Sequence, residues 1–213
     1  EETLSICMKN FNKVLYFDKE KKLITVESGI TVIEFLNFTL KHKLWIPQVP
    51  GYPFISLGGA IASNVHGKSA GLNGTIRNAV KEILIFHKTH GWLTLSQDQN
   101  KDIFDLTIGG YGLTGTIVKI TLKLIDFEGF NFQTSINKIN SINEALSLVR
   151  NSKDEVYAWH RVHPNMKNFG DGLVFCNKID QKNSQKNLND LKPIKSKSFK
   201  NLINFCFWNK FTV

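Results

Sequence analysis

The chain has 213 residues, of which 42% are hydrophobic, and it carries a formal net charge of +9. This length allows a buried core in one domain, or in one domain and part of a second, and the sixteen Phe and four Trp argue against a disordered chain. No apolar run reaches the ~18 residues that a membrane span needs, and no signal peptide opens the sequence.

The positive charge is concentrated toward the C-terminus. Residues 178–200 contain seven Lys and two Asp, and the chain has only three Arg. Because proteins that bind nucleic acid rely heavily on Arg, a solvated loop is favoured over a nucleic-acid surface, and an acidic membrane surface is the second alternative. The three cysteines form no Cys-x-x-Cys pair and indicate isolated thiols in a reducing compartment.

The N-terminal part predicts a hairpin followed by a helix. Residues 14–17 and 23–26 are β-rich runs on either side of a charged turn. Thr31 and Glu34 have the spacing of a capping box, which predicts that a helix begins here. The predicted apolar face of this helix comprises Ile33, Leu36 and Leu40.

Residues 50–68 combine a Pro-Gly turn with a run of small side chains and end in His-Gly-Lys. Small residues let backbone amides approach a ligand closely, and amides at a turn or a helix start suit a phosphate. Ser56 stands where it would cap such a helix. A tight turn leading into a buried helix explains the same glycines, so the segment by itself leaves both interpretations open.

The middle of the chain predicts two strands, at residues 79–87 and 92–95, and then a short helix at residues 103–107 with Asp102 as its cap. Apolar and polar residues then alternate over residues 116–124, which is typical of a strand.

Residues 110–115 match G-x-G-x-x-G letter for letter, but they follow a predicted helix and precede a strand. The dinucleotide-binding fingerprint needs the opposite order. We therefore reject a nicotinamide-binding Rossmann fold, and expect that these glycines bring the backbone close to a neighbouring strand or to a ligand.

The pattern changes after residue 125. Ser141 and Glu144 form a second capping box, and strand-like runs follow at residues 156–163 and 173–176, so we place a domain boundary near residue 126. His160 and His163 would face opposite sides of a strand, which argues against a metal site. The aromatic-rich residues 199–211 suggest the core of an incomplete second domain, with a membrane-facing patch as the alternative.

Four motifs, in this order and spacing, resemble the FAD-binding domain of the vanillyl-alcohol-oxidase (PCMH-type) flavoproteins. They lie at residues 45–51, 56–63, 66–68 and 108–117, and the resemblance covers about residues 4–125. It implies an α+β fold with a PCMH-type FAD-binding domain in residues 1–126, which has a mixed or antiparallel sheet with flanking helices. The start of a second α+β substrate domain would follow in residues 127–213.

The resemblance also implies the cofactor FAD and no metal. In that family the Pro-Gly turn and the small-residue run surround the FAD pyrophosphate and ribityl chain, and His66 would face flavin and substrate as the candidate catalytic residue. The implied cofactor contacts are Gly51, Ser56, Leu57, Gly58, Gly59, Ser63, Asn64, Val65, His66 and Ile117.

Two parts of the family pattern are expected outside this sequence. Its first FAD loop would precede residue 1, which leaves covalent attachment of FAD open, and its catalytic Lys and a flavin-contacting Tyr would follow residue 213. The chain alone is therefore expected to bind FAD weakly and to show no turnover.

The His-Gly-Lys ending at Lys68 is most similar to oxidases of polyprenyl-phosphate-linked pentoses. It implies oxidation of a sugar hydroxyl to a ketone, oxygen or a quinone as electron acceptor, and no nucleic-acid partner. The expected location is cytoplasmic, with a peripheral position at the inner membrane surface for a lipid-linked substrate. Two alternatives stay open: an aldonolactone or alditol oxidase acting on a soluble sugar, and a non-catalytic flavin-binding module.

Overall fold

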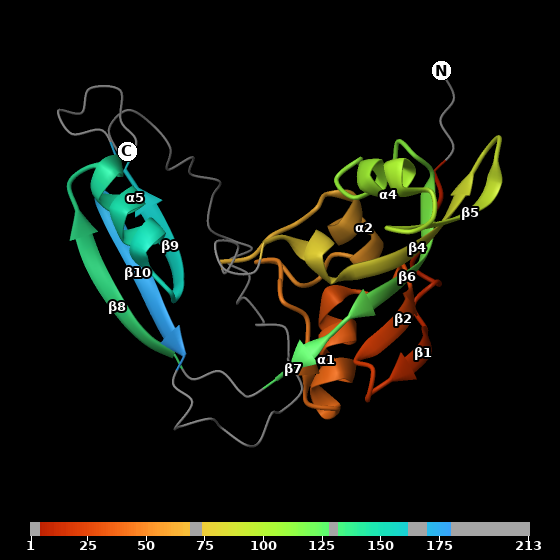
Figure 1. The fold of residues 1–213 in the computed structure, drawn as a ribbon, viewed down its shortest axis with the longest axis horizontal. Coiled ribbons are helices and arrows are strands. Elements are labelled where there is room, and N and C mark those ends of the chain that lie inside the picture. The colour runs from red at the N-terminus through yellow and green to blue at the C-terminus, as the bar shows by residue number, and fades with distance from the viewer. Residues whose placement is uncertain (1–4, 69–73, 128–131, 162–169, 180–213) are drawn as a thin grey trace, which may run out of the picture.

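The computed structural model describes residues 5–68, 74–127, 132–161 and 170–179 (Figure 1). The elements before residue 128 are β1 (Val14–Asp18), β2 (Leu23–Glu27), α1 (Val32–Lys41), β3 (Leu44–Trp45), α2 (Leu57–Ala62), η1 (Ile76–Ala79), β4 (Val80–His87), β5 (Gly91–Ser96), α4 (Lys101–Thr107), β6 (Thr116–Lys123) and β7 (Ile125–Asp126). The later elements are β8 (Phe132–Ile139), α5 (Ile142–Asn151), β9 (Glu155–His160) and β10 (Gly172–Ile179).

A five-stranded sheet in the order β1-β2-β6-β4-β5 forms the framework of the first part, and every neighbouring pair in it is antiparallel. A three-stranded antiparallel sheet in the order β8-β10-β9 follows. The predicted α+β class is confirmed. The predicted domain boundary near residue 126 falls between β7 and β8 and stays a prediction.

The predicted N-terminal hairpin is confirmed by the pairing of β1 with β2, in which Asp18 lies opposite Leu23. The side chain of Asp18 accepts a hydrogen bond from the backbone N–H of Lys21 at 2.8 Å and so closes the turn. The strand predicted at residues 116–124 is confirmed as β6, which pairs with β2 on one side and β4 on the other.

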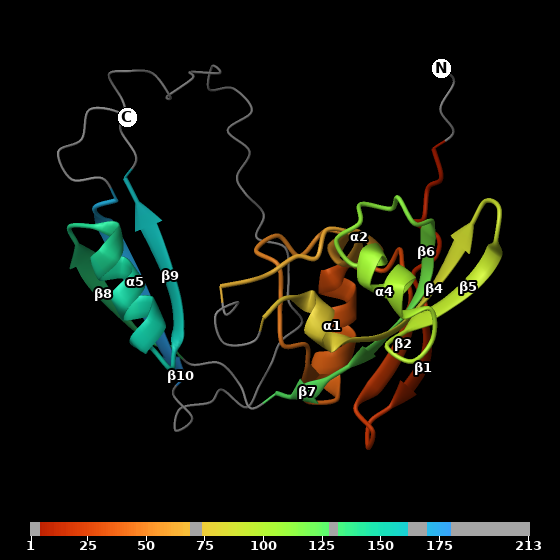
Figure 2. The ribbon, with the colours of Figure 1, turned by 45° about the horizontal axis from the view of Figure 1, so that its top comes forward.

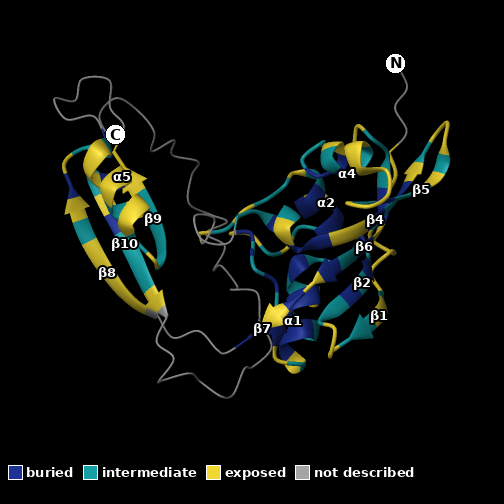
Figure 3. Ribbon diagram, in the orientation of Figure 1, coloured by how far each residue is buried: buried dark blue, intermediate teal, exposed yellow. Residues whose placement is uncertain are grey.

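The core of the first part lies between the five-stranded sheet and the helices α1 and α2, whose ribbons carry many buried residues (Figure 3). Phe35 in α1 is fully buried, as are Ile83 in β4 and Ile120 in β6. The predicted apolar face of α1 needs one correction: Ile33 is only half-buried. The residues that α1 buries are Val32, Phe35, Leu36, Thr39 and Leu40.

The first capping box is present as predicted. The Thr31 hydroxyl oxygen accepts the N–H of Glu34 at 3.3 Å, and the Glu34 carboxylate accepts the N–H of Thr31 at 2.9 Å. The Thr31 hydroxyl also donates to the Glu34 carboxylate at 2.6 Å. These bonds to the ionised form, the one from the hydroxyl first, hold the pKa of Glu34 below its ordinary value of 4.5.

We expect Thr31→Ala to lower the free energy of unfolding by about 1 kcal/mol at neutral pH, because α1 loses its cap. A lowered pKa in the folded state stabilises the fold above pH 4.5, and this contribution is lost as the pH falls through the folded pKa. Urea denaturation at several pH values should therefore show that the difference in the free energy of unfolding between wild type and Thr31→Ala becomes smaller in acid.

The matched control for this prediction is Thr75→Ala. Thr75 precedes η1 and makes no side-chain capping bond, so its truncation should leave the free energy of unfolding nearly unchanged. An equal loss in both variants would contradict the capping account.

The short helix before the glycine-rich loop differs from its prediction at its start. Asp102 does not cap it; the helix begins at Lys101, and Asn100 is the cap residue, with φ of 52° and no side-chain capping bond. Asp102 lies in the first turn, where its charge still suits the helix dipole. Sequence spacing alone misplaced the cap because Asn in the left-handed region was not anticipated.

In the second part, α5 lies against the three-stranded sheet (Figure 2) and buries Ala145 against Ile139 and Val174. Ser141 caps α5 by accepting the N–H of Glu144 at 3.3 Å. The Glu144 carboxylate bonds the N–H of Asn140, at 2.8 Å, so the second capping box is displaced by one residue.

The strands predicted at residues 156–163 and 173–176 correspond to β9 and β10. His160 lies at the end of β9, and His163 lies outside the described residues, as does most of the lysine-rich segment and all of residues 199–211. No helix in the described ranges is long and apolar enough to cross a membrane.

Candidate functional site

A groove of about 210 Å³ lies beside α2. It is called the α2 groove below, and its lining comes from four parts of the chain that are far apart in the sequence. Its lining residues are Met8, Ser28, Ser56, Gly58, Gly59, Ala62, Gly112, Gly115, Thr116 and Ile117. Typical small-molecule pockets measure roughly 300–1,000 Å³, so the α2 groove would hold one part of a large ligand rather than the whole of it.

Small residues leave this groove open for a structural reason. Gly58 is buried, and a Cβ built on it would lie 2.9 Å from the Cβ of Ser28, so α2 packs directly on the chain after β2. Gly59 is exposed, and a Cβ there would meet only the Ser56 Oγ, at 3.1 Å. Gly58 therefore serves packing, whereas Gly59 keeps the groove clear.

The amides at the start of α2 do not all point at a ligand. The N–H of Leu57 donates to Ile30 O at 2.8 Å, and that of Gly58 donates to Ser28 O at 2.8 Å. Ser56 caps the helix as predicted, since its Oγ accepts the N–H of Gly59 at 3.2 Å. The expectation that this segment offers unobstructed amides is therefore wrong for these three N–H groups.

Ser28 was not anticipated and is a notable polar group of the groove. It is 2% exposed, and its Oγ has no hydrogen-bond partner in the described part of the chain. Its backbone is fully used: the N–H donates to Val118 O at 3.0 Å, and the carbonyl accepts from Gly58. A buried hydroxyl without a partner costs stability, so it fits a position where a ligand would supply the missing bond.

The other wall of the groove comes from the segment that mimics a dinucleotide fingerprint. It lies between α4 and β6, so the inverted order of helix and strand is confirmed. A Cβ on Gly115, whose φ is +130°, would lie 2.8 Å from Phe86 O on the neighbouring strand β4. Gly112, with φ of +81°, faces open space. Gly115 thus allows close packing on the neighbouring strand, and Gly112 leaves the groove free of a side chain.

Of the residues implied as cofactor contacts, four line the α2 groove: Ser56, Gly58, Gly59 and Ile117. Gly51, Leu57, Ser63, Asn64, Val65 and His66 are not in its lining. Leu57 is fully buried in the core, and Val65 packs against that core. Asn64 has φ of 45°, and its Oδ1 is buried without a hydrogen-bond partner among the described residues.

Six further residues line the groove and were not among the implied contacts: Met8, Ser28, Ala62, Gly112, Gly115 and Thr116. The sequence signal for Gly112 and Gly115 was present in the G-x-G-x-x-G match. No local pattern marks Ser28, which follows β2 and meets α2 only through the tertiary fold.

His66 is exposed, and its Nδ1 lies 3.4 Å from Gly67 O. The turn that carries it is held by Gln48, whose side-chain oxygen accepts the N–H of Gly67 at 2.8 Å. The neighbouring Lys68 extends to the second sheet, where its Nζ lies 4.2 Å from the ring centre of Tyr157. The His-Gly-Lys turn therefore meets the second part of the chain.

Tyr157 belongs to an aromatic face on the side of the three-stranded sheet away from α5. The Tyr157 ring stacks on the Phe175 ring, with centroids 4.8 Å apart. The Trp159 ring centroid lies 5.9 Å from that of Phe175. Trp159 is 69% exposed. A flat, partly exposed aromatic surface suits a sugar ring or an apolar chain.

The remaining histidines show no sign of a shared ligand site within the described ranges. His87 and His90 stack on each other at 4.8 Å across the β4–β5 turn, where the His87 Nδ1 accepts the N–H of His90 at 3.2 Å. His87 is half-buried, and His90 is exposed. The Nδ1 of His160 lies 2.8 Å from Gly170 O.

Residues 1–96 match the family FAD_binding_4, described as an FAD binding domain. Three curated relatives are similar. Decaprenylphosphoryl-beta-D-ribose oxidase of Mycolicibacterium smegmatis is 28% identical over 73% of this chain and 34% of its own length. D-lactate dehydrogenase of Anaerostipes hadrus is 30% identical over 56% of the chain and 26% of its own length. L-gulonolactone oxidase of Mus musculus is 29% identical over 56% and 27%.

Among solved structures, an alkyldihydroxyacetonephosphate synthase superposes with a TM-score of 0.56 and 21% identity, over 67% of this chain and 26% of that one. This likeness concerns the fold. The chain spans between about a quarter and a third of the length of the curated relatives it matches.

Proposed function

We propose that this chain is part of a PCMH-type FAD-dependent flavoprotein, and that the full-length protein oxidises a sugar hydroxyl to a ketone on a polyprenyl-phosphate-linked pentose. FAD is its cofactor, and its relatives are oxidases and dehydrogenases that act on CH–OH groups. For this reason we favour an enzyme over the alternative of a non-catalytic flavin-binding module. The substrate is the part that needs argument.

The α2 groove fits one part of FAD. Ser28 Oγ lacks a partner at the groove, and a phosphate or ribityl oxygen would supply one. Gly59 and Gly112 place no side chain there. Ser56, Gly58, Gly59 and Ile117 are retained as proposed cofactor contacts. Several backbone amides at the start of α2 already donate hydrogen bonds within the protein. We therefore propose that side-chain hydroxyls and the glycine-rich wall, rather than those amides, contact the cofactor.

The extent of the match to the ribose oxidase carries the substrate proposal. It covers 158 residues, more than the 127 that precede the end of the first part, so it must reach into the three-stranded sheet. The matches to D-lactate dehydrogenase and L-gulonolactone oxidase cover 125 and 120 residues. Because residues beyond the cofactor domain bear on the choice of substrate, we give the longer match to the ribose oxidase more weight.

We place the sugar between the His-Gly-Lys turn and the aromatic face. Lys68 already bridges these two regions through Tyr157, and His66 is exposed beside it. In this arrangement His66 faces the reacting carbon, Lys68 attracts an anionic phosphoryl group, and Trp159 packs against the sugar or the lipid chain.

The chemistry divides between cofactor and protein. When bound, FAD accepts the hydride from the carbinol carbon. The protein orients the hydroxyl and moves its proton to a base. Oxygen or a quinone takes up the electrons. We propose that His66 orients the substrate.

A soluble sugar lactone is the second candidate substrate. It is favoured by the similarity to L-gulonolactone oxidase, which is 29% identical over 120 residues. Lys68 favours the phosphorylated substrate over the lactone. A cation at this turn attracts a phosphoryl group but has no charge to pair with on a neutral lactone.

Anaerobic reduction of the flavin in the full-length protein tests this proposal. Its visible absorbance should bleach with a polyprenyl-phosphoryl pentose and stay unchanged with L-gulono-1,4-lactone and with D-lactate. Bleaching by the lactone or by lactate instead, with no response to the lipid-linked sugar, would overturn the substrate assignment while leaving the cofactor assignment intact.

A peripheral position at an anionic membrane surface is a separate proposal, supported by the lysine-rich residues 178–200 and by a lipid-linked substrate. Full-length protein should sediment with vesicles that contain anionic lipid at low salt, and remain in the supernatant with neutral vesicles. Failure to bind the anionic vesicles would end this proposal.

A further inference from the structure

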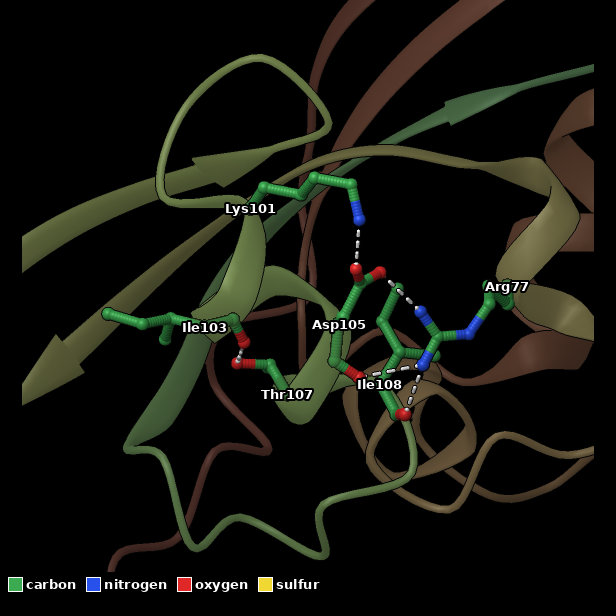
Figure 4. Close-up of polar contacts among 6 residues, drawn as sticks. All are labelled: Arg77, Lys101, Ile103, Asp105, Thr107 and Ile108. Atoms are coloured by element: carbon green, nitrogen blue, oxygen red, sulfur yellow. Dashed lines mark hydrogen bonds and ion pairs between the residues drawn. The ribbon is translucent and has the colours of Figure 1, made fainter.

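Arg77 in η1 donates three hydrogen bonds to the C-terminal end of α4 (Figure 4). Its Nη1 donates to the Asp105 carboxylate at 2.9 Å, and its Nη2 donates to two backbone carbonyls, Asp105 O at 2.7 Å and Ile108 O at 2.8 Å. Lys101 also pairs with Asp105 from within the helix. The charges and bonds of Lys101, and then of Arg77, hold the pKa of Asp105 below its ordinary value.

These contacts need an arginine. The last carbonyls of a helix have no partner within the helix, and a cation near them interacts favourably with the helix dipole. Only a planar guanidinium presents donors to a carboxylate and to two carbonyls at once, because the single ammonium of Lys is a point charge at the end of a flexible stem. The chain has three Arg in all.

The segment that leaves this cluster forms a wall of the α2 groove. After Ile108, the N–H of Gly109 donates to Ile61 O at 3.1 Å, and that of Tyr111 donates to Ala62 O at 2.9 Å, so the segment is joined to the end of α2. Gly112, Gly115, Thr116 and Ile117 then line the groove.

A pair of hydroxyls closes the same loop from its other end. The Oγ of Thr107 donates to Ile103 O at 2.7 Å and lies 2.8 Å from the Oγ of Thr114. Because Thr107 has one hydroxyl proton, Thr114 is the donor in the second bond. The loop is thus fixed at Ile108 by Arg77 and at Thr114 by Thr107.

We propose that Arg77 is a positioning residue for the cofactor: it sets the path of residues 108–115, and through that path the width of the α2 groove. The proposal rests on FAD being the ligand of that groove. Arg77 itself is absent from the lining, so its proposed effect on FAD affinity acts through the geometry of the groove.

The test compares three variants of the full-length protein. Arg77→Met removes all three contacts, and Arg77→Lys keeps a charge near Asp105 but loses the carbonyl bonds. Both should raise the FAD dissociation constant about tenfold, measured by flavin fluorescence at a temperature where circular dichroism shows the FAD-free variants fully folded. Hydrogen exchange at the amides of Gly109 and Tyr111 should accelerate in both.

Lys101→Met is the matched control, because it removes the other partner of Asp105 and leaves the carbonyl bonds in place. Its FAD dissociation constant should stay within twofold of wild type. Arg77 variants that melt earlier but bind FAD like wild type would show a merely structural role and overturn the proposal. Should Arg77→Met not fold, Arg77→Lys decides alone. Wild-type protein that binds no FAD would instead remove the cofactor assignment on which this proposal depends.

Discussion

Gly59→Val should abolish most FAD binding while leaving the fold intact. A Cβ at this position meets only Ser56 Oγ within 4 Å, so the added side chain has no core to disturb. Its two methyl groups would lie in the α2 groove, which Ser28 and Ile117 also line. The FAD dissociation constant should rise at least about tenfold, which is about 1.4 kcal/mol, with Gly59→Ala giving a smaller change.

Flavin fluorescence titration and thermal unfolding of the FAD-free protein together check this prediction. The melting temperature should change little, because valine is no worse than glycine inside a helix. Gln97→Val is the matched control, since it places the same side chain on an exposed loop outside the groove lining. An unchanged dissociation constant in Gly59→Val would mean that the cofactor does not use this groove.

Phe35→Ala should cause the largest loss of stability among single truncations in the first part. Phe35 is 0% exposed and lies on the face of α1 that packs on the five-stranded sheet. Truncation of a buried Phe removes its transfer free energy and leaves a cavity, which costs about 3–5 kcal/mol. That is a large fraction of the roughly 5–15 kcal/mol that holds a typical domain folded.

Urea denaturation followed by circular dichroism measures this loss. Phe86→Ala removes the same atoms from β4, where Phe86 is 44% exposed and packs edge-on against Trp92, and it should cost no more than about 1 kcal/mol. Similar losses in the two variants would show that α1 does not provide the core described above.

Elements with strong local signals could be predicted from the sequence. The alternation over residues 116–124 and the capping box at Thr31 each have a local physical cause, and both are present in the structure. The start of α4 was misplaced for an equally local reason, because Asp102 has the chemistry of a cap while Asn100 occupies the left-handed conformation that ends the preceding turn.

The groove was predicted in the right segments but not with the right atoms. The small residues around Gly58 and Gly59 were taken to free backbone amides for a phosphate. In the fold, Gly58 instead allows close packing on Ser28, and the amides of Leu57 and Gly58 bond to the chain that follows β2. Both facts depend on which residues lie beside α2, and those residues are about thirty positions away in the sequence.

Arg77 and Ser28 show the same limit. Arg77 gains its role only when η1 lies beside α4, and Ser28 gains its role only when the chain after β2 lies beside α2. No motif marks either residue. An ion pair predicted from sequence would have paired Asp105 with Lys101, four residues earlier on the same helix. The contact of Arg77 with two carbonyls adds a tertiary constraint that spacing cannot reveal.

Substitution of Ser28 combined with an FAD titration tests the central claim most directly, namely that the α2 groove holds the cofactor. If a cofactor oxygen supplies the partner that the buried Ser28 hydroxyl lacks, Ser28→Ala will weaken FAD binding several-fold and will not destabilise the FAD-free protein, in which that hydroxyl has nothing to lose. If neither Ser28→Ala nor Gly59→Val changes the FAD dissociation constant, the α2 groove does not hold the cofactor.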